Sequence, residues 1–83
     1  MNTAKIVTLV VITHQGIVDV QPFVVGASGD AATILTAQGE AQEKSNAYGE
    51  ADFLQWRKMG ATVFSAQTRK ARFEIWLANA LVI

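Results

Sequence analysis

The sequence predicts a single α+β domain with a β-hairpin, a helical middle and a second β-hairpin. Two β-branched segments lie near the start of the chain, an alanine- and glutamate-rich segment lies in the middle, and two more strand-like segments follow it. Eighty-three residues leave room for one hydrophobic core, so residues 1–83 form one domain. We expect a four-stranded antiparallel sheet with one or two helices on one face.

The first hairpin is expected to pair residues 5–13 with residues 17–25 through a turn at 14–16. Residues 5–13 are apolar at both alternating sets of positions, which is typical of a central strand or of one covered on both faces. Residues 17–25 alternate, with Val18, Val20 and Val24 on one face and Asp19 and Gln21 on the other. Pro22 cannot donate to a ladder, so this strand is expected at an edge or with a bulge.

The middle of the chain predicts two helices. Residues 26–30 form a loop in which Ser28 or Asp30 can accept hydrogen bonds from the first helical amides. A helix from Ala31 onward carries a modest apolar stripe, made of Ile34, Ala37, Ala41 and Tyr48, and a favourable pair, Glu40 and Lys44. Asn46 and Gly49 predict a break. A shorter helix is expected over residues 50–59, with acidic residues in its first turn and basic residues in its last.

The second hairpin is expected to pair residues 61–66 with residues 71–77 through a turn at 67–70. In the last strand Phe73, Ile75 and Leu77 share one face, and Arg72, Glu74 and Trp76 share the other. The same segment also fits a helical stripe of Phe73, Trp76, Leu77, Ala80 and Leu81. We favour the strand because the alternation is regular and the preceding segment offers a pairing partner.

Composition excludes several classes of protein. The chain has no cysteine, which removes disulfides, thiolate nucleophiles and cysteine zinc sites. The longest apolar run, Ile6 to Thr13, is far shorter than the roughly 20 residues of a spanning helix. Polar residues such as His14 and Asp19 interrupt what would be the apolar core of a secretion signal. We therefore expect a cytoplasmic protein without a membrane partner.

The net charge is zero, but the charges are segregated along the chain. Up to Trp56, two lysines stand against six carboxylates, a net charge of −4. From Arg57 onward, five cations stand against Glu74 alone, a net charge of +4. Such segregation predicts an acidic and a basic element that face each other, within one chain or between two copies.

The apolar content predicts self-association. Hydrophobic residues make up 51% of the chain, more than a domain of this size readily covers. The sequence ends on three aliphatic residues, Leu81, Val82 and Ile83, which are expected to complete the domain's own core or to form an oligomer interface. If the last strand is a sheet edge, residues 71–83 can pair with the same strand of a second copy.

No pattern in the sequence indicates catalysis. His14 is the only histidine, and a solvated turn residue is the expected role for it. Glu40, Glu43, Glu50 and Asp52 are not set at a spacing that pairs carboxylates. The loop from Gly26 to Gly29 lacks the lysine and the spacing of a phosphate-binding loop. We expect a protein that is not an enzyme and has neither a cofactor nor a metal site.

Cations interleaved with aromatic residues give the best candidate for a functional surface. Its expected members are Arg57, Lys58, Arg69, Lys70, Arg72, Glu74 and Trp76. Tryptophan and arginine dominate binding energy at protein interfaces, so an unidentified protein is the expected partner, with Trp76 as the anchor. The alternative is nucleic-acid or nucleotide binding through residues 57–76. A small cysteine-free domain without catalytic groups resembles phage or mobile-element proteins that bind and inhibit a host system.

Overall fold

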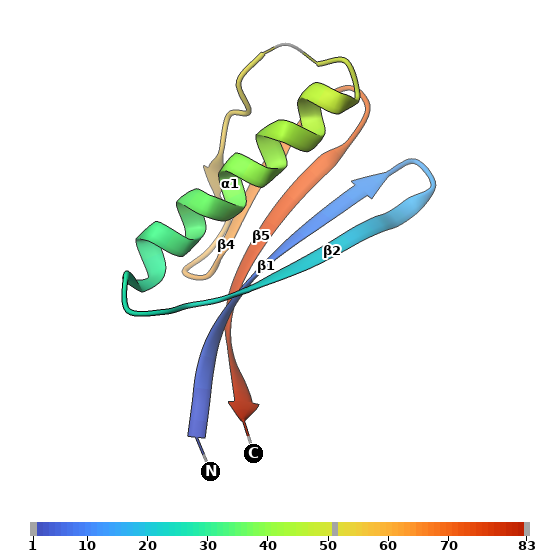
Figure 1. Cartoon of the computed structure of the whole chain (residues 1–83). Coiled ribbons are helices and arrows are strands. Elements are labelled where there is room, and N and C mark those ends of the chain that lie inside the picture. The colour runs from blue at the N-terminus through green and yellow to red at the C-terminus, as the bar shows by residue number, and fades with distance from the viewer. Residues whose placement is uncertain (1, 51, 83) are drawn as a thin grey trace.

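One helix lies across one face of a five-stranded antiparallel sheet (Figure 1). The computed structural model describes residues 2–50 and 52–82, with side chains for 5–50 and 52–78. The elements are β1 (Asn2–Thr13), β2 (Gly16–Val24), α1 (Gly29–Ala47), β3 (Arg57–Lys58), β4 (Val63–Gln67) and β5 (Arg72–Val82). The strand order is β2-β1-β5-β4-β3. The predicted α+β class with a helix on one face is confirmed, and the sheet has five strands where four were predicted.

Both predicted hairpins are present. β1 pairs with β2 and occupies an inner position in the sheet, as its doubly apolar pattern predicts. β2 lies at the edge, which agrees with Pro22. The pairing register shifts between Val11 and Ile12, which leaves Val18 as the extra residue of a bulge near the turn.

The last strand is central, and the helical alternative for this segment is wrong. β5 pairs with β1 from Arg72 to Val82, and its first five residues also pair with β4. A second copy therefore cannot add to β5 over residues 72–76, because both sides of the strand are already occupied. The expectation that the last strand forms a sheet edge is wrong for that part.

The predicted helix over residues 50–59 does not form. Gly49 adopts a φ of 89°, which ends the helical segment, and the chain then runs extended toward β3. The Gln42 side chain holds this extended segment: its Oε1 accepts a 2.8 Å hydrogen bond from the Leu54 amide, and its Nε2 donates to the Asp52 carbonyl. Leu54 packs into the core. The hydrogen bonds of Gln42 and the burial of Leu54 thus fix this segment, and they substitute for the hydrogen bonds of the predicted helix.

The core is thin because α1 contributes small residues to it. The residues of α1 that are buried recur every fourth position: Thr33, Ala37, Ala41 and Ser45. The large buried side chains come from β1 and β5: Val7, Leu9, Val11, Phe73 and Ile75. The predicted stripe on the helix is confirmed at Ala37 and Ala41, while Ile34 and Tyr48 are half-buried beside them.

The start of α1 differs from the expectation. Ser28 occupies the N-cap position but makes no side-chain capping hydrogen bond. Asp30 instead accepts a 3.0 Å hydrogen bond from the Lys5 ammonium group on β1. The carboxylate thus links the helix to the sheet.

The two glycines of the helical region should respond in opposite ways to alanine. Gly39 lies in the middle of α1 with no atom near the position of a Cβ, so Gly39→Ala should stabilise the fold by about 0.5–1 kcal/mol. Gly49 has a φ of 89°, so Gly49→Ala should destabilise it by about 1–2 kcal/mol. Urea unfolding followed by circular dichroism measures both changes. Equal effects of the two substitutions would contradict the assigned end of the helix.

Candidate functional site

The face of the sheet opposite α1 is uncovered by any helix in the part of the chain that the structure describes. We call this surface the open face. Its members follow from the strand register, which places paired residues on the same side of the sheet. They are Ile6, Thr8, Val10 and Ile12 of β1; Ile17, Val20, Pro22 and Val24 of β2; Arg57 of β3; Val63, Ser65 and Gln67 of β4; and Arg72, Glu74, Trp76 and Ala78 of β5.

Strand β2 turns its valines away from the core. Val20 and Val24 lie on the open face, and Val24 is 70% exposed. Asp19 and Gln21 are half-buried on the side of α1. In a strand whose apolar and polar residues alternate, the pairing register ordinarily turns the apolar side chains toward a buried surface. The orientation of β2 therefore leaves apolar side chains exposed on the open face.

Three residues of β5 form a ladder on the open face, next to this apolar region. The Arg72 guanidinium lies 2.8 Å from Glu74 Oε2, and the Trp76 indole N–H donates a 3.0 Å hydrogen bond to Glu74 Oε1. The Glu74 side chain is only 13% exposed, whereas the Trp76 residue is 46% exposed. One half-buried carboxylate thus fixes both an arginine and a tryptophan in an exposed position. These three residues were predicted to share a surface.

The other predicted surface residues do not join this ladder. Arg57 of β3 shares the open face, because it pairs with Ser65 of β4, whereas Lys58 pairs with Phe64 and lies on the other side of the sheet. Arg69 and Lys70 lie in the turn between β4 and β5. Arg57 and Lys58 are separated from this turn because they belong to a strand at the far edge of the sheet rather than to the predicted helix.

The oligomer interface predicted for Leu81, Val82 and Ile83 is not tested by the structure. Leu81 and Val82 belong to the backbone of β5, but their side chains are outside the described residues, as is Ile83 altogether. The residues that the sequence interpretation missed are the apolar ones of β1 and β2 on the open face. The sequence did contain one indication of this surface, because β1 is apolar at both alternating sets of positions.

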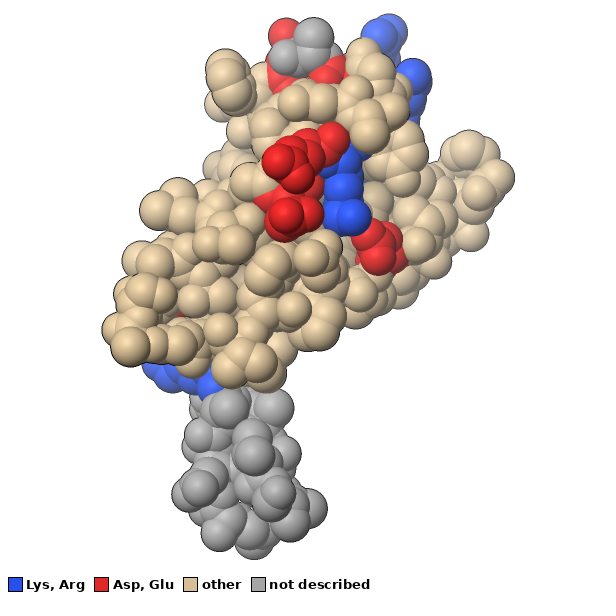
Figure 2. All heavy atoms as spheres, in the orientation of Figure 1, with Lys and Arg blue, Asp and Glu red and all other residues tan. Residues whose placement is uncertain are grey.

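The acidic and basic parts of the chain are not joined by ion pairs among the described residues. Lys5 with Asp30 and Lys44 with Asp19 belong to the acidic part, and Arg72 with Glu74 belongs to the basic part. Figure 2 shows acidic side chains gathered around a cation on the helix side of the molecule. The sequence predicted a pair of Lys44 with Glu40, but Lys44 pairs with Asp19 at 2.6 Å. Eight charged side chains remain outside these pairs: Glu40, Glu43, Glu50, Asp52, Arg57, Lys58, Arg69 and Lys70.

The pair of Asp19 and Lys44 should make stability depend on pH. The hydrogen bond from Lys44 lowers the pKa of Asp19, and the same bond raises the pKa of Lys44. The lowered Asp19 pKa stabilises the fold above the ordinary aspartate pKa, and this contribution is lost as pH falls through the folded-state value. The raised Lys44 pKa stabilises the fold below the ordinary lysine pKa, and this contribution is lost as pH rises through the folded-state value.

We therefore expect Asp19→Asn to lower the urea midpoint at pH 6 and to have a shrinking effect as pH approaches 2. The size is modest because both side chains are partly exposed. Asp52→Asn is the matched control, since Asp52 makes no ion pair among the described residues. A loss that persists unchanged at pH 2 would contradict the electrostatic explanation.

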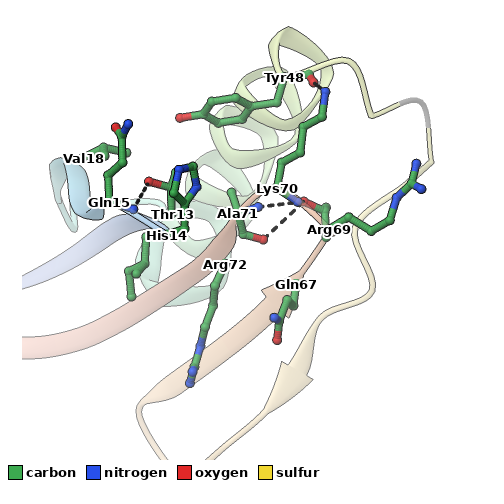
Figure 3. Close-up of a pocket in the computed structure, with 12 residues that line it drawn as sticks. Thr13, His14, Gln15, Val18, Tyr48, Gln67, Arg69, Lys70, Ala71 and Arg72 are labelled. Carbon is green, nitrogen blue, oxygen red and sulfur yellow. Dashed lines mark hydrogen bonds between the residues drawn. The ribbon is translucent and has the colours of Figure 1, made fainter.

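A cleft of about 780 Å³ lies where the two hairpin turns and the end of α1 meet (Figure 3). We call it the turn cleft. Its lining includes His14 of the first turn, Tyr48 just after α1, and Arg69 and Lys70 of the second turn. His14 is exposed, in agreement with its predicted role as a turn residue. The Lys70 ammonium donates a 2.6 Å hydrogen bond to the Tyr48 carbonyl and so closes one side of the cleft.

The described residues contain no group of three or more histidine, cysteine, aspartate or glutamate side chains that could hold a metal ion. None of their helices has both the length and the apolar character needed to cross a bilayer. Comparison of the chain with protein-family models, with curated proteins and with solved structures finds no match.

Proposed function

We propose that this protein is a non-enzymatic binding protein that forms a homodimer through the open face of its sheet. The observation that carries the proposal is the orientation of β2, whose valines face away from the only helix among the described residues. Full burial of one such side chain contributes about 1.5–3 kcal/mol. Two copies that pack their open faces together remove several of these side chains from water at once.

The dimensions of the molecule support this proposal. Its accessible surface is 5523 Å², whereas a compact monomer of 9.0 kDa has about 4,850 Å². Its radius of gyration is 13.1 Å, whereas a compact chain of this length has about 11.8 Å. The molecule thus exposes about 700 Å² more than a compact monomer of its mass, surface that a second copy can cover.

The ladder of Arg72, Glu74 and Trp76 supports a protein rather than a lipid or a small molecule as the occupant. An exposed tryptophan held by a carboxylate is a pre-oriented anchor, and arginine and tryptophan are the residue types that dominate interface energies. The ladder also carries both charges, so two copies related by a twofold axis can place Arg72 of one against Glu74 of the other. We propose further that an unidentified target protein competes with the second copy for this face, and that occupying the target's surface is how the protein inhibits it.

Sedimentation equilibrium tests the dimer directly. We expect a mass of twice 9.0 kDa at micromolar concentration, with dissociation on dilution. Trp76→Ala should shift the equilibrium toward monomer, and Leu35→Ala, which removes an exposed apolar residue of α1 on the other side of the sheet, should not. A wild-type protein that remains at 9.0 kDa up to millimolar concentration would contradict the proposal.

A further inference from the structure

We infer that the turn cleft binds a small organic phosphate of nucleotide size. This inference does not need the dimer: His14, Tyr48, Arg69 and Lys70 lie outside the open face, whereas Ile12, Gln67 and Arg72 belong to both surfaces. It rests on the charges, the shape and the position of the cleft at the end of the sheet where β1 and β2 turn and where β4 and β5 turn. The expected ligand carries a phosphate or diphosphate group and a flat organic body.

The charged side chains that line the cleft are all cations. Arg69 and Lys70 line it, and neither makes an ion pair with a carboxylate among the described residues. The hydrogen bond from Lys70 to the Tyr48 carbonyl fixes the ammonium group without neutralising its charge. Arg72 also lines the cleft but is paired with Glu74. None of the residues that line the cleft is an aspartate or a glutamate, so an anion meets no repelling group there.

The shape of the cleft suits a ligand with an organic ring. Its volume of about 780 Å³ lies within the roughly 300–1,000 Å³ of typical small-molecule sites. Figure 3 shows the rings of His14 and Tyr48 bordering the space from different elements, with Lys70 reaching up toward the end of the helix. Ile12 and Val18 add apolar surface. An aromatic or sugar ring can lie against these walls while its phosphate reaches Lys70. The Arg69 side chain extends away from the two rings and adds positive charge at the rim of the cleft (Figure 3).

The surroundings of the cleft favour a small phosphate over a nucleic-acid strand. Arg57 and Lys58, the other cations without an ion pair among the described residues, lie on β3 and do not line the cleft. Glu50 and Asp52 line the neighbouring hollow on the other side of Arg69. A strand that left the cleft in that direction would meet carboxylates, whereas nucleic-acid binding needs a continuous run of cations.

Titration of the ¹⁵N-labelled protein with ADP tests the inference. We expect saturable shifts of the backbone amides in residues 13–15 and 68–72, smaller shifts with inorganic pyrophosphate at equal concentration, and none with adenosine. Arg69→Gln should weaken ADP binding severalfold, because it removes a positive charge from the rim of the cleft. Lys58→Gln is the matched control: it removes one exposed cation outside the cleft and should leave the affinity unchanged.

Three results would overturn the inference. The first is that neither ADP nor pyrophosphate shifts these amides at millimolar concentration. The second is that Arg69→Gln and Lys58→Gln weaken ADP binding equally, which means a diffuse effect of net charge. The third is that an eight-nucleotide single-stranded DNA binds more tightly than ADP and is weakened by both substitutions, which means a nucleic-acid surface. Because Arg69 is exposed in a turn, both variants should fold, and their circular dichroism spectra check this.

Discussion

Val20→Asp should convert the protein from a dimer to a folded monomer. Val20 lies on the open face, pairs with Val10 of β1 and is 54% exposed in one copy. In the proposed dimer it becomes buried, and the burial of an unpaired carboxylate costs several kcal/mol. A twofold interface contains the substitution twice. We therefore expect the dissociation constant to rise at least about 100-fold, measured by sedimentation equilibrium.

Leu35→Asp provides the matched control for this experiment. Leu35 is 67% exposed and lies on α1, on the other side of the sheet, so its replacement adds the same charge without touching the open face. It should remain a dimer. Circular dichroism shows whether Val20→Asp keeps its strand content, and Val24→Lys at the end of β2 serves as a second variant if it does not. If the folded Val20→Asp and Val24→Lys variants remain dimers, the open face is not the interface.

Phe73→Ala should remove much of the stability of the domain. Phe73 is fully buried, and it is paired with Val11 on β1 and with Ala66 on β4. Phenylalanine-to-alanine substitutions in a core cost about 3–5 kcal/mol. A domain of this length has a total stability of roughly 4–12 kcal/mol. We expect the urea midpoint to fall by a third or more, and the protein to be partly unfolded at 37 °C.

Phe53→Ala is the control for the size of the side chain that is removed. Phe53 is 82% exposed in the loop before β3, so its loss should change stability by no more than about 0.5 kcal/mol. Both variants must be compared at one protein concentration, because self-association adds to apparent stability. Equal losses in the two variants would mean that Phe73 does not lie at the centre of the core.

Local patterns in the sequence were sufficient to predict both hairpins. The turn at residues 14–16 and the turn at 67–70 each join two segments of regular alternation, and adjacent alternating segments pair with each other in a sheet. The alternation of residues 71–77 also placed Arg72, Glu74 and Trp76 together, which the ion pair and the indole hydrogen bond of Glu74 confirm. These features depend on neighbours in the chain, and a sequence pattern can therefore reveal them.

The segment over residues 50–59 could not be predicted in the same way. Its acidic start and basic end match a helix dipole, but the hydrogen bonds that hold it come from Gln42, which is twelve residues from Leu54 along the chain. A contact between residues so far apart produces no periodic pattern of residues in the sequence. Arg57 and Lys58 therefore lie on a sheet edge, separated from the turn that holds Arg69 and Lys70.

The strand order and the orientation of β2 could not be predicted from the sequence either. Alternation in β2 shows that two faces exist, but it does not show which face meets the helix. That choice depends on Phe23 and Val25, which pack against the core, and on the ion pair of Asp19 with Lys44. The open face was missed for this reason, although it contributes most of the surface on which the proposed function depends.

The pairing of β1 with β5 has a consequence for how the protein folds during its synthesis. The two strands at the middle of the sheet come from opposite parts of the chain, with pairs from Ile12 and Arg72 to Asn2 and Val82. Contacts so distant in sequence slow folding, because a long stretch of chain must be closed before they form. On the ribosome, β1 and its apolar run remain open along one edge until β5 has emerged. The nascent chain should therefore be prone to aggregation until β5 has been synthesised, and a chaperone that shields β1 should raise the yield of folded protein.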